Sequence, residues 1–392
     1  MEEKDILIVG AGIFGLTIAE RVANVLQKNV VVVEKRGHIG GNSYSEVDQE
    51  TGIECHKYGA HIFHTSNEAV WEYVNAFSGF TDYQHRVYSV HKNEVYPLPI
   101  NLGTINQFFE ANFTPDEAKK LIADQAKSAP ENPRNLKEQG IKLIGQPLFE
   151  AFVMNYTAKQ WQMPAEKLSP DIIKRLPVRY NYNNRYFSNK YEGLPSDGYG
   201  NFFKAMLEAG SERIELRLDT DYFDDDELME FTRKGGLTVF TGPIDRFFDY
   251  KYGELNWRSI EFEKEILPVH DFQGCSVMNY ADLEVPFTRI IEFKHFHPER
   301  ANDGYSEDSQ KTVIYKEFSK KWHLGDEPYY PVGVKDDREK LEKYQELAKQ
   351  YPNIAFGGRL GEYAYYDMDV TFASALTTFE TKITDWYKTH ER

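Results

Sequence analysis

The sequence predicts an α/β fold in which a discontinuous Rossmann-like domain carries a helical insertion and an antiparallel β-sheet domain. Residues 5–34 have the pattern of a strand, a glycine-rich turn, a helix and a second strand. β-branched and aromatic runs recur between residues 256 and 320 with Pro and Asp breaks, which is typical of antiparallel strands. Short apolar segments with glycines return near residues 237–242 and 354–358. The first domain is therefore expected to be completed late in the chain.

Length and charge limit the class of protein. The 392 residues favour two or three domains, and 41% hydrophobic with 28% charged residues is ordinary for a soluble globular protein. The net charge of −16 argues against binding to nucleic acid or anionic lipid. No apolar run is long enough to span a membrane, and the chain enters a strand too early for a signal peptide. Cys55 and Cys275 fit neither a disulfide framework nor a metal site. We expect a cytoplasmic protein without a metal.

The order of patterns along the chain predicts the domain boundaries. Residues from about 70 to 175 have mostly helical patterns, and residues 176–200 are rich in Tyr, Asn and Gly, which favours extended or loop structure. The predicted Rossmann-like domain comprises residues 1–75, 200–255 and 350–392. The helical insertion, with a mobile active-site lid, comprises residues 76–175, and the antiparallel substrate domain comprises residues 176–199 and 256–349.

One basic segment contrasts with the acidic chain. No acidic residue occurs between Asp171 and Glu192, whereas five basic ones do. Such a segment can form an anion-binding wall, and a solvated charged face is the plainer interpretation. The basic residues are Lys174, Arg175, Arg179, Arg185 and Lys190.

The strongest local motif is GAGIFG at residues 10–15, between a buried strand and a helix. Gly10 allows the tight turn, Gly12 lets the backbone approach a pyrophosphate, and Gly15 lets helix and strand pack closely. The helix N-terminus adds a positive dipole. Glu34 ends the second strand, where a carboxylate can accept hydrogen bonds from ribose hydroxyls. These features together predict a dinucleotide site.

Two further segments favour FAD over NAD. Residues 35–42 (KRGHIGGN) continue from the acidic strand end into a Gly-Gly turn, which resembles flavoproteins of the glutathione-reductase and amine-oxidase type. Residues 357–359 (GGR), followed by Asp367 and Met368 at the start of a helix, resemble the flavin-end segment of the same group. No second G-x-G-x-x-G follows a strand, so no separate pyridine-nucleotide domain is predicted.

Longer blocks carry a more specific resemblance. They occur at residues 56–65 (HKYGAHIFHT), 156–161 (YTAKQW), 175–179 (RLPVR), 184–188 (NRYFS), 271–274 (DFQG), 285–290 (VPFTRI), 326–331 (DEPYYP) and 356–368. In this order they resemble the bacterial UDP-galactopyranose mutase family along nearly the whole chain.

The resemblance implies a flavin-dependent isomerase that interconverts UDP-galactopyranose and UDP-galactofuranose without net redox change. FAD would be active when reduced, with its N5 as nucleophile at the anomeric carbon, which divides one hard step into easier ones. The product would supply galactofuranose for cell-wall and surface glycans. An external reductant and a homo-oligomer, a dimer or larger, are also implied.

The motifs and the resemblance predict the site residues. Two arginines and two histidines are the catalytic candidates, because a guanidinium fork matches the oxygens of a departing diphosphate and the histidines would lie beside the flavin. The catalytic candidates are Arg175, Arg289, His61 and His64. The cofactor candidates are Gly10, Gly12, Phe14, Gly15, Glu34, Lys35, Gly41, Asn42, His61, Ile62, Gly242, Arg359, Asp367 and Met368. The substrate candidates are His85, Phe152, Tyr156, Thr157, Trp161, Arg175, Tyr186, Asn279, Arg289, Tyr329 and Tyr365.

Two residues depart from the pattern that the resemblance predicts. Phe318 replaces an expected phosphate-contacting Tyr, and Asp369 replaces an expected His. Two other functions remain open at this point. One is an ordinary amine-oxidase-type flavin oxidoreductase, and the other is a catalytically silent UDP-sugar sensor.

Overall fold

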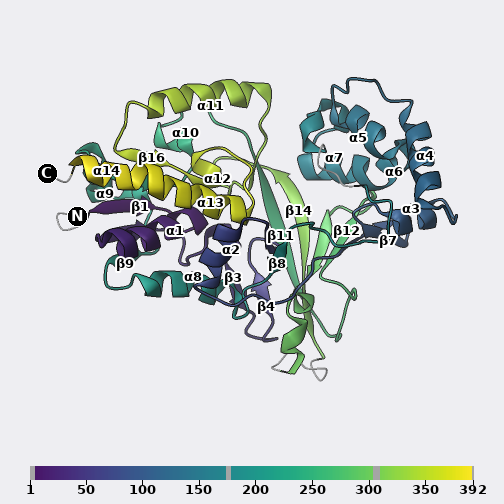
Figure 1. The fold of residues 1–392 in the computed structure, drawn as a ribbon, viewed down its shortest axis with the longest axis horizontal. Helices are drawn as coiled ribbons and strands as arrows, with labels where there is room; N and C mark the ends of the chain where they lie inside the picture. The colour runs from purple at the N-terminus through teal and green to yellow at the C-terminus, as the bar shows by residue number, and fades with distance from the viewer. Residues whose placement is uncertain (1–4, 174–177, 303–309, 391–392) are drawn as a thin grey trace.

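One half of the molecule is built around a five-stranded parallel sheet. The computed structural model describes residues 5–173, 178–302 and 310–390. In the order β16-β10-β1-β2-β9, every neighbouring pair of strands is parallel (Figure 1). The strands are β1 (Ile6–Val9), β2 (Val30–Val33), β9 (Ile214–Arg217), β10 (Thr238–Phe240) and β16 (Ile354–Phe356). The order confirms that late segments of the chain complete the sheet that the N-terminal strands begin.

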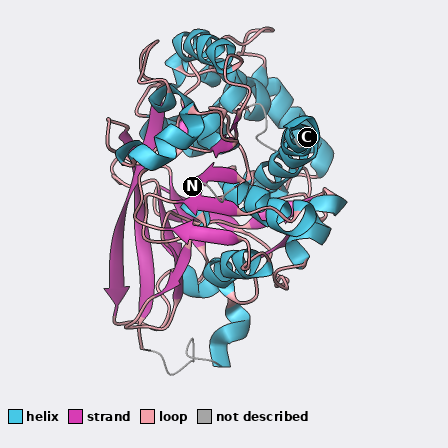
Figure 2. Cartoon of the chain, turned by 90° about the vertical axis from the view of Figure 1, so that its left-hand side faces the viewer, coloured by secondary structure: helices cyan, strands magenta, loops and turns pink. Residues whose placement is uncertain are grey.

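Helices cover this sheet. The helix after β1 packs against two helices from the later parts of the chain, α8 and α13. Figure 2 shows the stacked parallel strands with helices beside them and the longer strands of a second sheet to one side. The helices of this half are α1 (Ile13–Arg21), α2 (Glu68–Asn75), α8 (Gly198–Ala209), α9 (Asp226–Arg233), α10 (Ile244–Phe247), α11 (Lys335–Ala348), α12 (Gly358–Gly361), α13 (Met368–Thr378) and α14 (Thr384–His390).

The second sheet has seven strands in the order β15-β11-β14-β13-β12-β6-β7. All neighbouring pairs are antiparallel except β12 and β6. The strands are β6 (Val87–His91), β7 (Glu94–Leu98), β11 (Trp257–Leu267), β12 (Val277–Tyr280), β13 (Arg289–Glu292), β14 (Thr312–Lys321) and β15 (Tyr330–Pro331).

The predicted helical pattern of residues 70–175 is wrong for β6 and β7. They form a hairpin at the edge of the seven-stranded sheet. Alternate side chains of the hairpin, those of Val87, Ser89 and Tyr96, are buried, which is the pattern of strands and not of a helix. Residues 178–197 have the predicted loop and extended structure. Their described strand, β8 (Tyr191–Gly193), pairs with β5 (Phe63–Thr65) in a separate two-stranded sheet. A further small sheet pairs β3 (Ser45–Val47) with β4 (Glu54–His56).

Five helices beyond the β6–β7 hairpin form a separate layer with its own apolar core, on the far side of the second sheet in Figure 1. Sequence signals mark where two of them start. Thr114, the residue before Pro115, makes a capping box with Glu117, and Asn135 accepts a hydrogen bond from the Glu138 N–H. They are α3 (Leu102–Phe108), α4 (Pro115–Ala126), α5 (Leu136–Ile144), α6 (Gln146–Phe149) and α7 (Asn155–Trp161). None of the helices in the described residues is long and apolar enough to cross a membrane.

A buried carboxylate joins the β3–β4 turn to the second sheet. Asp48 accepts hydrogen bonds from the Thr51 N–H and hydroxyl at 2.8 Å each, and its Oδ2 lies 2.5 Å from Lys264 Nζ on β11. Burial alone would raise the pKa of Asp48, but the hydrogen bonds from Lys264 and Thr51 outweigh burial and lower it to about 2. The folded state therefore favours the charged form.

Asp48→Asn should destabilise the protein at neutral pH by about 1–2 kcal/mol, because the charged pair with Lys264 is lost. Since the folded pKa of Asp48 lies below its unfolded value, the wild-type advantage is complete above pH 4 and disappears as the pH falls toward 2. Thermal unfolding of both proteins at several pH values tests this. Asp116→Asn, whose carboxylate is 94% exposed, is the control. An equal gap between wild type and Asp48→Asn at pH 7 and pH 3 would contradict the ion-pair explanation.

Candidate dinucleotide and substrate site

A cavity of about 670 Å³ opens at the carboxyl ends of β1, β2 and β10. In a parallel sheet these ends are where nucleotides bind. The cavity is lined by every predicted cofactor residue except Ile62 and Asp367. Ile62 is buried and directly follows the lining residue His61 in the chain. Asp367 is the exposed N-cap residue of α13.

Glycines let two backbone segments approach each other at the cavity wall. Gly10 has φ +105°, and a Cβ there would lie 2.0 Å from Thr241 Oγ1. A Cβ on Gly41, with φ +57°, would lie 3.1 Å from Gly12 Cα. The N-terminus of α1, which follows Gly12, has no side-chain cap and no acidic residue in its first turn. Its N–H groups and dipole are thus suited to a pyrophosphate.

Charged residues surround the end of β2. Glu34 is 7% exposed and accepts hydrogen bonds from the backbone N–H groups of Ala11 and Arg36, at 2.9 and 3.0 Å. Lys35 and Arg36 both pair with Glu327, at 2.9 and 2.5 Å. The predicted cofactor residue Lys35 therefore contacts the segment that closes this side of the cavity.

The far end of the cavity contains residues that the sequence analysis missed. Residues 220–223 follow β9, and Arg246 follows β10. Arg246 pairs with Asp221 at 2.9 Å and lies 4.4 Å from the centre of the Phe223 ring. These residues belong to no motif. Their one sequence signal is their position after predicted parallel strands, where ligands of such sheets bind.

The loop after β4 presents His61 to the cavity. His61 Nδ1 lies 2.7 Å from the Gly59 carbonyl oxygen, and its backbone N–H donates to His56 Nδ1 at 3.1 Å. Burial, together with the charges of Arg359 and Arg289, lowers the pKa of His61 to about 4. The ring is therefore neutral at pH 7, and the proton on Nδ1 leaves Nε2 as an acceptor.

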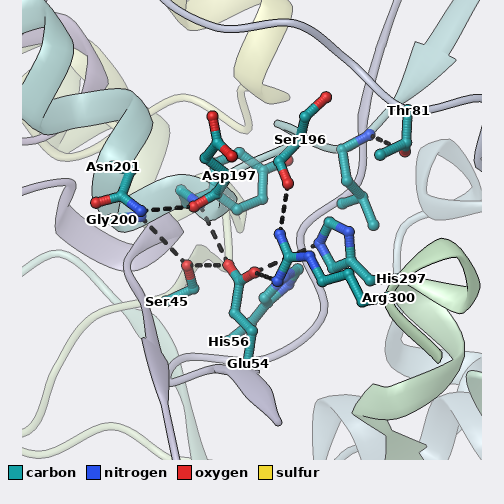
Figure 3. Close-up of polar contacts among 12 residues, drawn as sticks. Ser45, Glu54, His56, Thr81, Ser196, Asp197, Gly200, Asn201, His297 and Arg300 are labelled. Carbon is teal, nitrogen blue, oxygen red and sulfur yellow. Dashed lines mark hydrogen bonds and ion pairs between the residues drawn. The ribbon is translucent and has the colours of Figure 1, made fainter. Parts of the chain in front are cut away.

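A buried polar network fixes the strand from which this loop begins (Figure 3). The Glu54 carboxylate accepts hydrogen bonds from Ser45 Oγ at 2.5 Å, from Arg300 at 2.7 Å and from the Tyr199 N–H at 3.3 Å. The network thus ties β4 to the start of α8 and to the segment that joins β13 and β14. His56, two residues along, is fully buried and stacks on Phe296 at 5.1 Å.

Two other predicted histidines lie in aromatic surroundings. His64 stacks on Phe187 with ring centres 3.7 Å apart. His85 is 5% exposed, its Nδ1 lies 2.9 Å from the Tyr83 hydroxyl, and burial and the charge of Arg289 lower its pKa to about 3. The His85 ring is therefore neutral at pH 7.

Arg289 begins β13 on the face of the second sheet that looks toward the His61 loop. Its Nε lies 2.8 Å from a carboxylate oxygen of Glu317, which is 3% exposed, and this charge holds the pKa of Arg289 above its ordinary value against the effect of burial. Asn279 is directly opposite Arg289 on β12, and its Oδ1 is buried with no hydrogen-bond partner in the part of the chain that the structure describes. An unsatisfied buried acceptor beside a cation is suited to a polar ligand.

An aromatic pair lies near this arginine. Tyr330 and Tyr365 stack with centres 5.3 Å apart, and Arg359 lies 5.4 and 5.5 Å from the two rings. Arg359 also donates to the carbonyl oxygens of Tyr329 and Tyr366. The sequence analysis chose Tyr329, which is 5% exposed, and missed its neighbour Tyr330.

Helix α7 packs against β14 and carries Tyr156, Thr157 and Trp161. Lys159 Nζ lies 2.6–3.0 Å from four backbone carbonyl oxygens of the β12–β13 loop, those of Tyr280, Asp282, Val285 and Phe287. Burial lowers the pKa of Lys159 to about 8. The helix is thus held to the loop that joins Asn279 and Arg289.

Other predicted residues lie elsewhere. Phe152 is 4% exposed and packs on Tyr96 in the core of the helical layer, whereas Tyr186 is 43% exposed. Phe318 follows Glu317 on β14 and so points to the opposite face of the sheet, where it packs on Phe287. The expected phosphate position for this side chain is therefore wrong. Asp369 lies in the first turn of α13, where its carboxylate accepts from the Val370 N–H.

Arg175 lies outside the described residues. The described basic residues of its segment have partners within the chain: Arg185 pairs with Glu192, Lys190 pairs with Glu68, and Arg179 donates to the carbonyl oxygens of residues 183, 185 and 186. These three residues do not form the anion-binding wall considered above.

Comparisons with known proteins identify the family. The family model described as UDP-galactopyranose mutase matches residues 151–365, and that of an NAD(P)-binding Rossmann-like domain matches residues 8–77. The chain is 43% identical to the probable UDP-galactopyranose mutase of Klebsiella pneumoniae, over 96% of this chain and 94% of that protein. It is 41% identical to the dTDP-fucopyranose mutase of Escherichia coli, over 95% and 96%. A crystal structure of reduced UDP-galactopyranose mutase has the same fold, with a TM-score of 0.73, 16% identity and coverage of 97% and 94%.

Gly10→Ala should abolish dinucleotide retention, because the new methyl group would collide with Thr241 at a positive φ. Gly52→Ala is a matched control, since Gly52 has φ +72° but nothing within 4 Å of the added Cβ. Gly52→Ala should cost only about 1 kcal/mol of backbone strain and should keep the dinucleotide. The bound dinucleotide is measured by absorbance and extraction after purification. Equal retention by the two variants would contradict the role assigned to the Gly10 turn.

Proposed function

The chain belongs to the UDP-galactopyranose mutase family, and we propose that it interconverts the pyranose and furanose forms of a nucleoside-diphosphate sugar on reduced FAD. UDP-galactose is the first candidate substrate. The observation that carries the proposal is the position of His61. Its ring lines the dinucleotide cavity, and the charge of Arg289 on the second sheet acts on it. The cofactor site and the candidate diphosphate site are therefore neighbours.

The cavity residues fit FAD. Gly10, Gly12 and Gly41 keep the wall free of side chains, the uncapped start of α1 suits the pyrophosphate, and Glu34 suits a ribose. Met368 and Arg359 line the end formed by the last segment of the chain. When bound and reduced, FAD supplies a nucleophilic nitrogen, N5, for the anomeric carbon.

The residues of this chain bind and orient the sugar nucleotide. Arg289, kept charged by Glu317, stabilises the negative charge that grows on the diphosphate as the anomeric bond breaks. Tyr330 and Tyr365 offer hydroxyl groups to phosphate oxygens, and α7 supplies aromatic surface for the base. Neutral His61 offers Nε2 as an acceptor at the cofactor. Arg175 is proposed as a second clamp on the diphosphate from the family resemblance alone.

A second candidate substrate is dTDP-fucopyranose. Its support is the identity of 41% to the Escherichia coli dTDP-fucopyranose mutase, which nearly equals the 43% identity to the Klebsiella pneumoniae protein. Both substrates have a diphosphate, so the cation contacts above suit either. In both cases an external electron donor must first reduce the flavin. With UDP-galactose, the product would supply galactofuranose for surface glycans.

Turnover should require a reduced flavin but consume no electrons. With dithionite-reduced enzyme and UDP-galactofuranose, chromatography should show UDP-galactopyranose, and the oxidised enzyme should show little or none. dTDP-fucofuranose is assayed in parallel, and the larger kcat/KM identifies the substrate. Product formation by oxidised enzyme at the same rate, or oxygen consumption in proportion to substrate, would favour an oxidase instead. Binding of either nucleotide without any product would favour a silent sensor.

Arg289→Met should retain FAD while kcat falls at least 100-fold, because the diphosphate loses a charge-assisted contact worth about 3 kcal/mol in the transition state. This change also leaves the Glu317 carboxylate buried without its partner. The double variant Arg289→Met/Glu317→Gln removes both charges and should recover thermal stability but not activity. Recovery of activity in the double variant would contradict the role of Arg289 at the diphosphate.

A further inference from the structure

Arg258, in the second position of β11, is a buried cation that has no counterion among the residues that the structure describes. Its side chain belongs to a residue that is 5% exposed, and its Nε is buried with no hydrogen-bond partner. Nη2 donates to Ser319 Oγ at 2.9 Å, which is its single side-chain hydrogen bond in the described part of the chain. Within the same residues, no carboxylate pairs with it and no aromatic ring lies beneath it. Burial alone lowers its pKa.

Such a group is costly unless something satisfies it. A guanidinium carries five N–H donors and stays charged in proteins, so it cannot escape the cost of burial by losing a proton. Buried charges are normally paired, and each exception needs an explanation. Arg289 on the same sheet shows the usual arrangement, because Glu317 is its partner. Arg258 has no such partner within residues 5–173, 178–302 and 310–390, so an anion that is not part of the chain is the natural partner.

The register of the second sheet locates Arg258 relative to the candidate diphosphate site. Arg289 is opposite Glu317 on β14, and Arg258 is opposite Lys321 on the same strand. Because side chains alternate along a strand, those of residues 317, 319 and 321 lie on the same face of β14. Arg258 contacts the middle one of the three, Ser319. Both arginines therefore project from the same face, on either side of β14.

The other neighbour of Arg258 is an aromatic residue of the site. Arg258 is directly opposite Tyr330 on β15, so the two side chains share a face. Tyr330 in turn stacks on Tyr365, which is 60% exposed. A ligand that lies against Tyr365 and Tyr330 would come next to the guanidinium of Arg258.

We propose that Arg258 binds the phosphate groups of the nucleoside-diphosphate sugar, as a further cation beside Arg289. The proposal rests on the proposed function. The two guanidinium groups would approach the diphosphate from two strands, with the Ser319 hydroxyl between them and the Tyr330 phenol on the other side of Arg258. In the protein without ligand, burial of the unpaired Arg258 guanidinium costs free energy. Binding of the diphosphate would offset this cost because the guanidinium then has an anionic partner.

The test compares Arg258→Met with wild type in the FAD-loaded protein. Because the variant removes an unpaired buried charge, its melting temperature without ligand should equal or exceed that of wild type. Its affinity for UDP should fall at least tenfold, whereas its affinity for uridine, which has no phosphate, should change less than twofold. Arg258→Lys, which keeps a charge but not the fork, should lie between the two for UDP. The pair dTDP and thymidine is used if wild type prefers dTDP.

Arg233→Met is the matched control. Arg233 is a 69% exposed arginine of α9 that pairs with Glu230, and its loss should leave UDP affinity unchanged. A melting temperature of Arg258→Met more than about 5 °C below wild type would overturn the premise of an unpaired charge. UDP affinity within twofold of wild type, or equal losses for UDP and uridine, would overturn the phosphate contact. Wild-type protein that binds neither UDP nor dTDP would instead overturn the proposed function itself.

Discussion

The position of β1 in the middle of the parallel sheet constrains the rest of the molecule. Residues 6–8 are fully buried, so their backbone N–H and C=O groups must be paired by strands on both sides. One neighbour, β2, is close in sequence, but the other, β10, begins only at Thr238. The residues between β2 and β10 must therefore leave this sheet and later return to it. The dinucleotide cavity lies where these returning segments meet.

This constraint explains why the candidate site has so many separate contributors. The cavity takes residues from the turn after β1, from the ends of β2 and β10, from the segment after β14 and from the last helices. The segments between the strands of the parallel sheet must be held in place so that their side chains reach the cavity. Polar contacts serve as these anchors: Glu54 ties β4 to α8, Asp48 ties the β3–β4 turn to β11, and Lys159 ties α7 to the β12–β13 loop. Each anchor is buried or half-buried, where competition from water is weak.

The sequence predicted the parts whose chemistry is local. The glycine turn at residues 10–15, Glu34 at a strand end and the helix caps at Thr114 and Asn135 follow from backbone geometry within a few residues. The family resemblance added Arg289. Prediction failed where distant pairing decides the outcome: β6 is a strand because it pairs with the edge of β12, and β7 pairs in turn with β6. Arg258 and Tyr330 became visible only when two strands far apart in sequence were paired.

The cation contacts also show which part of substrate recognition they can determine. The guanidinium groups are proposed to bind the diphosphate, which UDP-galactose and dTDP-fucose share, so they would not discriminate between the two. The substrates differ in a thymine methyl group, a ribose hydroxyl and the hydroxyl of the sugar C6. A site built to bind a hydroxyl rejects the analogue that lacks it far more strongly than an apolar pocket rejects an added one. Discrimination must therefore come from walls with buried polar groups, such as the unpaired Asn279 Oδ1, and from the surface of α7. Family membership settles the shared diphosphate chemistry before it settles the sugar.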